Sequence, residues 1–261
     1  MGKGLDKLLQ PTVFDRSFQY GDGVFTTIKV TQGKLQHWSL HWQRLALSCQ
    51  RLSIHIPAED TVLQHARAAI SADEQVLKIV VSRGHGGRGY SAKGIEAADI
   101  YVTTSPLPVF SAVQSGIKLG VAKLQLGIQP LLAGIKHCSR LETVLLKLEA
   151  EQSEFDDLLA TDTAGFITEC SAANIFFQID GNWHTPELSR AGVAGVMREW
   201  ILSQIDVIEG NYSLADVRKA DAIFISNALM GIVPVRSFEL KKLDLAPVLQ
   251  LQAELSTIET K

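Results

Sequence analysis

This chain of 261 residues has no large excess of positive or negative charge. Its 25 lysines and arginines are nearly balanced by 28 aspartates and glutamates, which leaves a formal net charge of −3. A basic excess supplies much of the affinity that proteins have for a phosphate backbone. Nucleic acid is therefore not expected as a partner.

Long apolar runs are also missing. No stretch reaches the length needed to span a bilayer. The N-terminal sequence MGKGLDKLLQPTVFDRS meets charge and polarity before a signal-peptide core could form. The sequence predicts a cytoplasmic protein that is not bound to a membrane.

Cysteine is scarce. Cys49, Cys138 and Cys170 are too few and too scattered for a disulfide framework or a thiolate metal site, so we expect reduced thiols. His37 and His41 lie four residues apart, which on a helix would place two imidazoles on one face, as some metal sites require. No HExxH pattern or third ligand accompanies the pair, and no metal site is expected.

The chain does contain enough apolar sequence for a sizeable core, since 46% of its residues are hydrophobic. Val24 to Thr31 is rich in β-branched residues and runs into the turn Gln32-Gly33-Lys34, which predicts the first arm of a hairpin. Trp38 to Leu52 has helical spacing instead, with Arg44 and Arg51 near the edge of the apolar face. That face consists of Trp38, Trp42, Leu45, Cys49 and Leu52.

A second helix is expected next, with Pro57 in its first turn and its apolar positions continuing to Ile70. Val76 to Ser82 and Ile100 to Thr104 are expected strands. The glycine-rich loop RGHGGRGYS lies between them.

Ser105 to Ser115 is the best candidate for a linker, because its two prolines resist both helix and central strand. The sequence thus predicts a smaller N-terminal α/β domain over residues 1–107, a linker over 108–115 and a larger C-terminal domain over 116–261 that carries most of the site.

In the second domain, Asp180-Gly181-Asn182 is a hairpin turn signal, and a helix begins after Gly195. Since hairpins outnumber strand-helix-strand repeats, two α/β lobes with a mainly antiparallel or mixed sheet content, an α+β arrangement, fit this order. The expected strands are Ile117–Lys123, Asp157–Thr161, Asn174–Ile179 and Ala222–Ser226, and an expected helix carries an apolar stripe of Leu141, Val144, Leu145 and Leu148.

One lysine stands out in LAGIKHCSRLETVLLKL, because Lys136 follows an apolar approach and Gly134 and precedes the expected helix. A solvated lysine at the boundary of an element is the common case. A lysine amine that is partly desolvated in a pocket would instead be a nucleophile for carbonyl groups, as in a Schiff base. The residue alone leaves both interpretations open.

Glu169 lies between two apolar, strand-like runs in GFITECSAANIFF. A carboxylate that enters a sheet is costly without a partner, and a protonated pyridinium nitrogen would be a suitable one. A turn glutamate held by solvent, Ser171 or Asn174 is the alternative.

Two stretches could hold a phosphate. AGVMR, Ala194 to Arg198, opens a helix after a glycine, where unpaired N–H groups and the helix dipole favour an anion, although many helices begin in this way without binding anything. Ser226-Asn227-Ala228, at the end of a strand, could add backbone donors, and Arg44 a positive charge.

Taken in order, these stretches resemble the fold-type IV pyridoxal-phosphate enzymes, a family that contains branched-chain aminotransferases, D-amino-acid aminotransferases and 4-amino-4-deoxychorismate lyases. The resemblance extends from about Asp15 to Val235. It rests on FDRSFQYGDGVFTT (14–27), HWQRL (41–45), SRGHGGRGYS (82–91), AGIKHCSRLE (133–142), ITECSAANIFF (167–177), HTP (184–186), AGVMRE (194–199) and SNALMGIVPV (226–235).

The resemblance implies a two-lobed fold of the D-amino-acid-aminotransferase type, with pyridoxal 5'-phosphate between the lobes, and a homodimer. GIKHCSRLE, SRGHGGRGYS, TECSAAN and SNALM are similar to the lyase branch, whereas branched-chain enzymes typically carry a lysine followed by GGNY. The expected reaction converts 4-amino-4-deoxychorismate to 4-aminobenzoate and pyruvate, a step of folate biosynthesis.

Residue by residue, the resemblance makes Lys136 the catalytic lysine that binds the cofactor, and Glu169 the partner of the pyridine nitrogen. The phosphate would be held by Arg44 and by the backbone at Val196, Met197, Asn227 and Ala228. Arg140 or His137 would orient the cofactor's phenolic oxygen or simply begin the helix, and Arg140 is the preferred of the two.

For the substrate, Arg88 and Tyr90 match loop positions that bind a carboxylate in related aminotransferases, and Thr27 follows the position of their pocket aromatic. A mobile surface arginine and a strand-forming threonine are the alternatives. The chain departs from the family twice: no N-terminal strand with an Asn-Gly turn is evident in MGKGLDKLLQPTVF, and Ala194 replaces a common proline.

Two other functions remain possible from the sequence. An aminotransferase of the branched-chain or D-amino-acid type would use the same cofactor and much the same residues. An inactive phosphate-binding module built around RGHGGRG is more remote, because the loop lacks the Walker lysine pattern and a capped helix.

Overall fold

The computed structural model describes residues 11–259, which divide into two compact units. The first unit contains the chain up to Pro108 together with Lys136–Arg140, and the second contains Val109–Ile135 and the chain from Leu141. The sequence had placed Lys136 in the C-terminal domain, whereas in the structure its segment groups with the first unit. The Lys136 segment pairs with the first unit because the Phe25 N–H donates to the Lys136 carbonyl oxygen at 2.9 Å.

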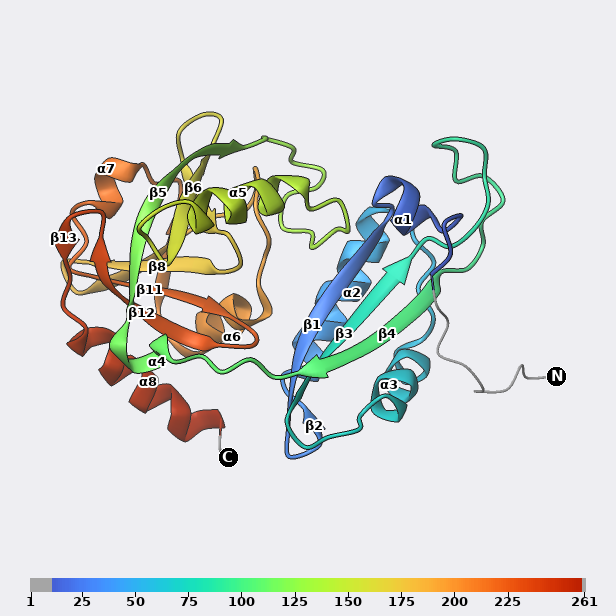
Figure 1. Cartoon of the computed structure of the whole chain (residues 1–261), viewed down its shortest axis with the longest axis horizontal. Coiled ribbons are helices and arrows are strands. Elements are labelled where there is room, and N and C mark those ends of the chain that lie inside the picture. The colour runs from blue at the N-terminus through green and yellow to red at the C-terminus, as the bar shows by residue number, and fades with distance from the viewer. Residues whose placement is uncertain (1–10, 260–261) are drawn as a thin grey trace. The chain divides into compact units, whose positions relative to one another are not determined.

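The first unit is built on a four-stranded antiparallel sheet in the order β2-β1-β3-β4 (Figure 1). At the β1–β2 turn, Gln32 and Gly33 both have positive φ, 51° and 69°, as the tight hairpin turns favoured by strand twist require. The predicted hairpin is therefore confirmed. The strands are β1 Gly23–Thr31, β2 Lys34–Leu35, β3 Gln75–Ser82 and β4 Asp99–Pro106.

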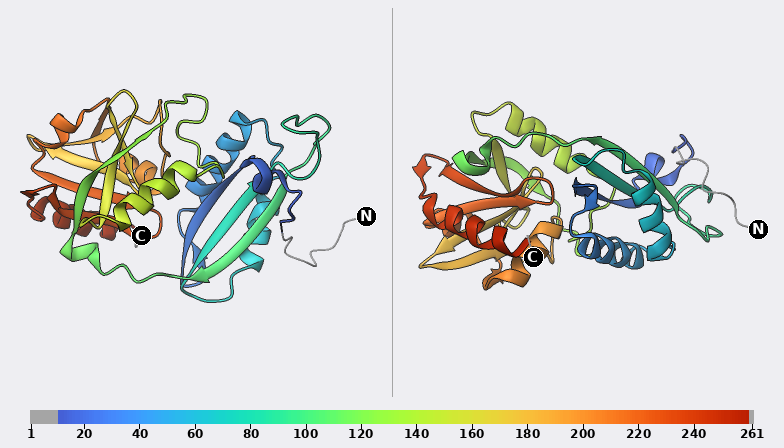
Figure 2. Two further views of the ribbon diagram at one scale, coloured as in Figure 1. Left: turned by 45° about the horizontal axis from the view of Figure 1, so that its top comes forward. Right: turned by 90° about the horizontal axis from the view of Figure 1, so that it is seen from below.

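Helices α2 and α3 cover one face of this sheet (Figure 2). Alternate residues of β1, among them Thr26 and Ile28, are buried on that face, and they pack opposite Leu45 and Cys49 from the predicted stripe of α2. The second helix starts later than expected, since Pro57 precedes the N-cap Ala58. The helices are α1 Arg16–Tyr20, α2 Trp38–Arg51 and α3 Glu59–Ala68.

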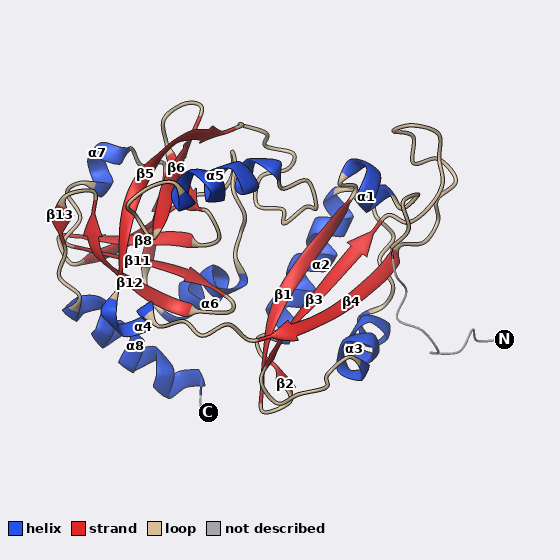
Figure 3. Ribbon diagram, viewed as in Figure 1, coloured by secondary structure: helices blue, strands red, loops and turns tan. Residues whose placement is uncertain are grey.

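The second unit contains a nine-stranded mixed sheet in the order β10-β9-β8-β11-β12-β5-β6-β7, with β13 paired to β12 (Figure 3). A second hairpin turn, at Asp180 and Gly181, again has two residues of positive φ, as predicted. The strands are β5 Ile117–Leu126, β6 Asp157–Asp162, β7 Ile167–Cys170, β8 Asn174–Ile179, β9 Asn182–Pro186, β10 Val207–Gly210, β11 Ala222–Asn227, β12 Gly231–Phe238 and β13 Lys241–Lys242.

Two apolar clusters lie on opposite faces of the central strands of this sheet. Ile223 and Ile225 of β11 belong to the cluster that includes β5, β6, β7 and β12. Ala222 and Phe224 point the other way and pack with Met197 and the residues of α6 and α8. The helices are α4 Ala112–Ser115, α5 Leu141–Glu151, α6 Val196–Gln204, α7 Leu214–Val217 and α8 Ala246–Glu259.

Helix α5 forms where it was predicted, but its apolar stripe is not buried. Leu146 and Ala150 are the residues that pack inward, with Leu126 and Leu158. The stripe that predicted the helix lies on its exposed face, and the exposed fractions are 70%, 51%, 47% and 46% for Leu141, Val144, Leu145 and Leu148.

The expected linker contains regular structure at both ends. Pro106 pairs with Gln75 at the end of β4, where an edge position tolerates a residue without an N–H. Helix α4 occupies Ala112–Ser115. Most of the stretch in which no N-terminal strand was evident, residues 1–10, lies outside the described residues. None of the helices that the structure describes is long and apolar enough to cross a membrane.

Candidate functional site

Lys136 lies in a segment that runs beside the start of β1. The segment is held from both sides, because the Phe25 N–H donates to the Lys136 oxygen and the Cys138 N–H donates to the Gly23 oxygen, each at 2.9 Å. His137 forms a bridge with Val24. The lysine is therefore fixed by strand-like pairing five residues before α5 begins, and it does not lie on the helix itself.

The Lys136 amine faces an aromatic ring on the sheet surface that α2 and α3 leave uncovered. Its Nζ lies 4.6 Å from the centre of the Phe25 ring, and the Nζ of Lys78 lies 4.7 Å from the same ring. Thr27 is on this face too, directly opposite Lys78 in the register of β1 and β3. Two ammonium groups thus gather around one ring, and each contact with the ring is favourable although the two like charges repel each other.

Lys78 was not singled out from the sequence. It is exposed in a strand whose neighbours are almost all buried. A charged residue in the middle of VLKIVVS was the available signal, since a strand buried on both faces would exclude it.

Arg44 approaches β1 from the opposite face. Its Nη2 donates to the Thr26 hydroxyl at 2.5 Å, and the same hydroxyl lies 2.6 Å from Nδ1 of His41. Thr26 and His41 are fully buried, with exposed fractions of 0% and 1%. Nδ1 of His41 is therefore hydrogen-bonded to Thr26, a role that the spacing of His37 and His41 did not predict.

The glycine-rich loop is organised by a residue that sequence reasoning missed, Arg16. The Arg16 guanidinium donates to the carbonyl oxygens of Gly89, Ser91 and Tyr90 at 3.0, 3.1 and 3.1 Å. It also pairs with Asp22 at 2.8 Å. The FDRS motif that contains Arg16 was noticed only as part of the resemblance, because a contact across more than seventy residues leaves no local pattern.

The two loop side chains expected to bind substrate are exposed. Arg88 lies at the surface, and Tyr90 has an exposed fraction of 87%, with its ring packed edge-on against Tyr20 at 5.3 Å. The structure thus fixes the backbone of the loop by way of Arg16 but leaves these two side chains facing solvent.

Asp15, His85 and Asp99 bring possible metal-ligand atoms within 4.8 Å of one another. These atoms already have hydrogen-bond partners. The Asp15 carboxylate accepts from Ser82 at 2.8 Å and from Tyr101 at 2.6 Å, and His85 bonds to Asp99 at 2.9 Å. The arrangement is a hydrogen-bond network, buried at Asp15 and exposed at His85, that anchors the loop to β3 and β4.

In the second unit, Glu169 is a buried carboxylate on β7, with an exposed fraction of 8%. Its Oε2 accepts the Val193 N–H at 2.9 Å. Gly192 has a φ of 83°, and a Cβ there would come within 2.6 Å of the Thr168 side chain. The turn before α6 is therefore fitted closely around Glu169.

The N-terminus of α6 supplies the backbone donors expected for a phosphate. Val196 and Met197 are its first residues, and Gly195 is the N-cap. A Cβ at Gly195 would lie only 2.1 Å from Oδ1 of Asn174, whose Nδ2 donates to the Val193 oxygen at 2.9 Å. Only glycine fits here, so the approach to these N–H groups is kept open.

Ser226 provides an independent sign that this place suits an anion. It pairs with Asn174 across β11 and β8, and it shares a strand face with Phe224, which packs against α6. Its hydroxyl is buried and has no hydrogen-bond partner among the described residues. Buried hydroxyls are normally paired, so a phosphate at the α6 N-terminus fits the donors that the structure provides.

From the sequence, Asn227 was expected to contribute only its backbone to the site, but its side chain also makes hydrogen bonds. Its Oδ1 accepts the N–H groups of Leu229 and Met230, both at 2.9 Å, and its Nδ2 donates to the Ala172 oxygen at 3.0 Å. The side chain therefore shapes the turn in which Ala228 lies. Sequence reasoning placed Asn227 in the site and missed this shaping role.

Arg140 and His137 are half-buried in the Lys136 segment. Burial raises the pKa of the neighbouring Cys138 thiol to about 11, with the charges of Lys78 and Arg140 opposing it. Burial raises the pKa of Cys49 to about 12 and that of Cys170 well above its usual range. All three are free thiols, as predicted, and none is poised as a nucleophile.

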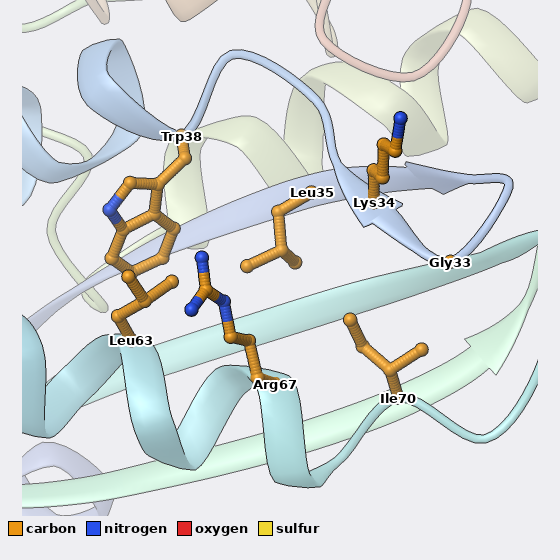
Figure 4. A pocket seen from close by; sticks show the side chains of 7 residues that line it. All are labelled: Gly33, Lys34, Leu35, Trp38, Leu63, Arg67 and Ile70. Carbon is orange, nitrogen blue, oxygen red and sulfur yellow. The ribbon is translucent and has the colours of Figure 1, made fainter.

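A pocket of about 210 Å³ lies elsewhere in the first unit, where the β1–β2 hairpin meets the ends of α2 and α3 (Figure 4). Leu35, Leu63 and Ile70 form its apolar wall, Trp38 lies at one end, and the Arg67 side chain reaches across it. No residue predicted for the site lines it, so the chemistry is assigned to the groups above.

Comparison with known proteins decides the family. The model of the family described as Amino-transferase class IV matches residues 23–238. The chain belongs to this family. Enzymes of the class are pyridoxal-phosphate enzymes of fold type IV, and the predicted fold is thereby confirmed.

Individual relatives of this class IV chain include both lyases and aminotransferases. It is 41% identical over 229 residues to the aminodeoxychorismate lyase of Vibrio harveyi, which covers 85% of this chain and 84% of that protein. It is 30% identical over 246 residues to a putative branched-chain-amino-acid aminotransferase of Methanocaldococcus jannaschii, with 90% and 85% covered. The crystal structure of 4-amino-4-deoxychorismate lyase from Pseudomonas aeruginosa matches with a TM-score of 0.86 and 33% identity, covering 94% of each chain.

Proposed function

We propose that this class IV protein is a pyridoxal-phosphate-dependent lyase that converts 4-amino-4-deoxychorismate to 4-aminobenzoate and pyruvate, a step of folate biosynthesis. The observation that carries the proposal is the 41% identity to a lyase of this name over 85% of the chain. The lysine, the buried carboxylate and the helix N-terminus described above supply the groups that such chemistry needs.

The cofactor would be held by groups of three kinds. Lys136 would bind it covalently, and Glu169 would lie against its ring nitrogen. The N–H groups of Val196 and Met197, the turn at Asn227 and Ala228, and the Arg44 guanidinium would hold its phosphate. Arg140 would face its phenolic oxygen. Positive charge and backbone donors are the groups that bind phosphate well in proteins.

When bound, pyridoxal phosphate supplies an electron sink that acidifies the C–H bond beside the substrate amine. Lys136 would have two tasks, first to hold the cofactor and then, with its amine free, to act as the general base whose Nζ accepts the proton from the amine-bearing ring carbon. As the C–O bond to the enolpyruvyl group breaks, that group would leave as enolpyruvate and take up one proton to become pyruvate, and the remaining ring would become aromatic. Glu169 would keep the ring nitrogen protonated.

The substrate carries two carboxylates, so cations should line its site. Lys78 is the best placed of the first unit's residues, because its ammonium shares the Phe25 ring with that of Lys136 and lies opposite Thr27. We propose that Lys78 and Thr27 contact the substrate, and that Arg88 and Tyr90 reach it only if the loop moves. Lys78→Met should then raise KM more than it lowers kcat, while Lys78→Arg should restore KM.

An aminotransferase is the second candidate, favoured by the 30% identity to a putative branched-chain enzyme. The two functions are separated by supplying the purified protein either with 4-amino-4-deoxychorismate or with amino acids and a 2-oxo acid. We expect kcat/KM to be far greater for the first. Amino transfer to the 2-oxo acid without formation of 4-aminobenzoate would contradict the proposal.

The cofactor assignment has its own test. Purified protein with added pyridoxal phosphate should show a visible absorption band, and borohydride reduction should fix the cofactor to the peptide that contains Lys136. A protein that stays colourless with added cofactor would contradict this assignment whatever the substrate is.

A homodimer is proposed as well, with the exposed face of α5 at the contact. Four large apolar side chains, Leu141, Val144, Leu145 and Leu148, lie on one side of this helix and are at least 46% exposed. Apolar patches of this kind mark protein contacts, and a helix face can pair with its own copy about a two-fold axis. The double variant Val144→Glu with Leu148→Glu should be monomeric in sedimentation, whereas Lys147→Glu on the same helix should not change the mass. A double variant that stays dimeric would exclude this face.

A further inference from the structure

His41 is a buried titratable residue to which the proposed reaction gives no task. It lies on α2, one turn before Arg44, and its Nδ1 is 2.6 Å from the Thr26 hydroxyl oxygen. Arg44 Nη2 is 2.5 Å from the same oxygen. Three side chains from α2 and β1 thus meet at one hydroxyl that solvent does not reach.

The hydrogens at this hydroxyl can be assigned from chemistry alone. A guanidinium only donates, so the Thr26 oxygen must accept the Arg44 hydrogen bond. The oxygen has a second lone pair, but if His41 Nδ1 also donated to it, the buried hydroxyl hydrogen would have no acceptor among the described residues, so we assign Nδ1 as the acceptor of that hydrogen. His41 is therefore the neutral tautomer with its hydrogen on Nε2. A doubly protonated ring would place two donors against an oxygen whose own hydrogen had no acceptor.

The surroundings of His41 keep it neutral. Burial lowers the pKa of the imidazole well below its usual range, and the charges of Arg44 and His37 lower it further. The Thr26 hydroxyl therefore always has an acceptor at neutral pH. Since hydrogen bonds in a chain polarise one another, donation to His41 makes the Thr26 oxygen a better acceptor for the guanidinium.

We propose that His41 and Thr26 are positioning residues that fix the Arg44 guanidinium for the phosphate group of the cofactor. The proposal rests on the proposed role of Arg44 and adds two residues that do not touch the cofactor themselves. The side chains of Phe25 and Thr27 point to one face of β1, and that of Thr26 points to the other. Adjacent residues of one strand therefore contact Arg44 on one face and Lys136 on the other.

The test compares the binding of pyridoxal phosphate with that of pyridoxal, which lacks the phosphate, by absorption titration of protein freed of cofactor. Loss of a hydrogen bond to a charged group predicts that Thr26→Val binds pyridoxal phosphate about 10-fold more weakly, with pyridoxal changed less than about 2-fold. Thr26→Ser keeps the hydroxyl and should retain affinity. Thr185→Val, which removes another fully buried threonine hydroxyl, should change neither ligand.

The same measurement on His41 keeps the proposal testable if Thr26→Val does not fold. Asn places its side-chain oxygen near the position of Nδ1, so His41→Asn should retain the selective affinity for pyridoxal phosphate that His41→Leu loses. Equal weakening of both ligands in Thr26→Val or His41→Leu would mean that these residues only maintain the fold, and it would overturn the proposal.

A double variant separates this proposal from the role of Arg44. If Thr26 acts through Arg44, adding Thr26→Val to Arg44→Gln should weaken the binding of pyridoxal phosphate no further. A further loss in the double variant would overturn the relay while leaving Arg44 in the site. Unchanged binding in Arg44→Gln alone would instead remove Arg44 from the proposed phosphate site.

Discussion

The two units contribute different kinds of groups to the proposed chemistry. The first unit presents charged side chains, Lys136, Lys78 and Arg44, each fixed by an aromatic ring or a hydroxyl. The second presents backbone N–H groups at α6 and one buried carboxylate, Glu169, around turns that admit only glycine.

This difference determines which substitutions should matter in each unit. A cationic side chain acts through its own atoms, so replacing it removes the function. A backbone donor is present in every residue except proline, so its loss requires a change of shape, and the glycines become the sensitive positions. Substitutions in the first unit should therefore reduce function when they remove a charge, and substitutions in the second when they add bulk at a glycine.

The largest effect is expected at the amine of the first unit. Lys136→Ala removes both the covalent link and the general base, and turnover should fall by about 1000-fold or more. Steady-state formation of 4-aminobenzoate measures it, and the visible absorption band should vanish in the same variant. Lys78→Ala, which removes the neighbouring ammonium, should keep the band. If Lys136→Ala kept both turnover and the band, the amine would not be the catalytic group.

The carboxylate of the second unit should rank next. Glu169→Gln preserves size and the acceptor for the Val193 N–H but removes the charge, so cofactor binding should remain measurable. Turnover should fall about 10- to 100-fold, the loss expected for one charge-assisted hydrogen bond. Single-turnover kinetics separate the two effects. Unchanged turnover would remove Glu169 from its role beside the ring nitrogen.

Crowding in the second unit is tested at the helix N-cap. In Gly195→Ala the new Cβ would lie 2.1 Å from Asn174 Oδ1, so Asn174 or the turn must move. We expect a cost of about 1–3 kcal/mol in the free energy of unfolding, together with weaker cofactor binding. Gly127→Ala is the control, because its Cβ would meet only the flexible end of Glu142 at 3.2 Å. Equal behaviour of the two variants would refute the idea that shape is what matters here.

The last effect is confined to the stability of the first unit and concerns its dependence on acid pH. Burial raises the pKa of the Asp22 carboxyl, but hydrogen bonds from Arg83 and Arg16 lower it by more. In the folded protein the pKa of Asp22 therefore lies below its ordinary value of 3.8. This stabilisation is present above pH 3.8 and is lost as the pH falls through the lowered pKa. Asp22→Asn should therefore cost about 1–3 kcal/mol in urea unfolding at pH 7 and approach wild type in acid. Asp221→Asn, at an exposed position of the second unit, should cost nothing, and a pH-independent loss in Asp22→Asn would contradict the ion-pair origin.

Elements with a regular period could be predicted from the sequence. β1 follows alternation and α2 follows helical spacing, whereas β8 and β11 are short, continuous apolar runs. The two hairpin turns follow from the turn residues at Gly33 and at Asp180-Gly181. Lys136, Glu169 and Arg44 were found because family motifs mark them, and the structure adds how each is held.

The remaining errors have a common physical cause, which is contact between distant parts of the chain. The apolar stripe on α5 correctly predicted a helix but did not indicate which of its faces is buried. The residues that point inward are Leu146 and Ala150. Arg16 binds a loop about seventy residues away. The pairing of the Lys136 segment with β1 likewise depends on tertiary structure and has no local signal.

The most direct test of the proposed lyase reaction is its stoichiometry. Purified protein with bound pyridoxal phosphate is incubated with 4-amino-4-deoxychorismate, and pyruvate and 4-aminobenzoate are quantified by chromatography over many turnovers, with Lys136→Ala as control. We predict equal amounts of the two products, no requirement for a 2-oxo acid, and neither product from the variant. Consumption of the substrate amine only when a 2-oxo acid is present, with no pyruvate released, would contradict it.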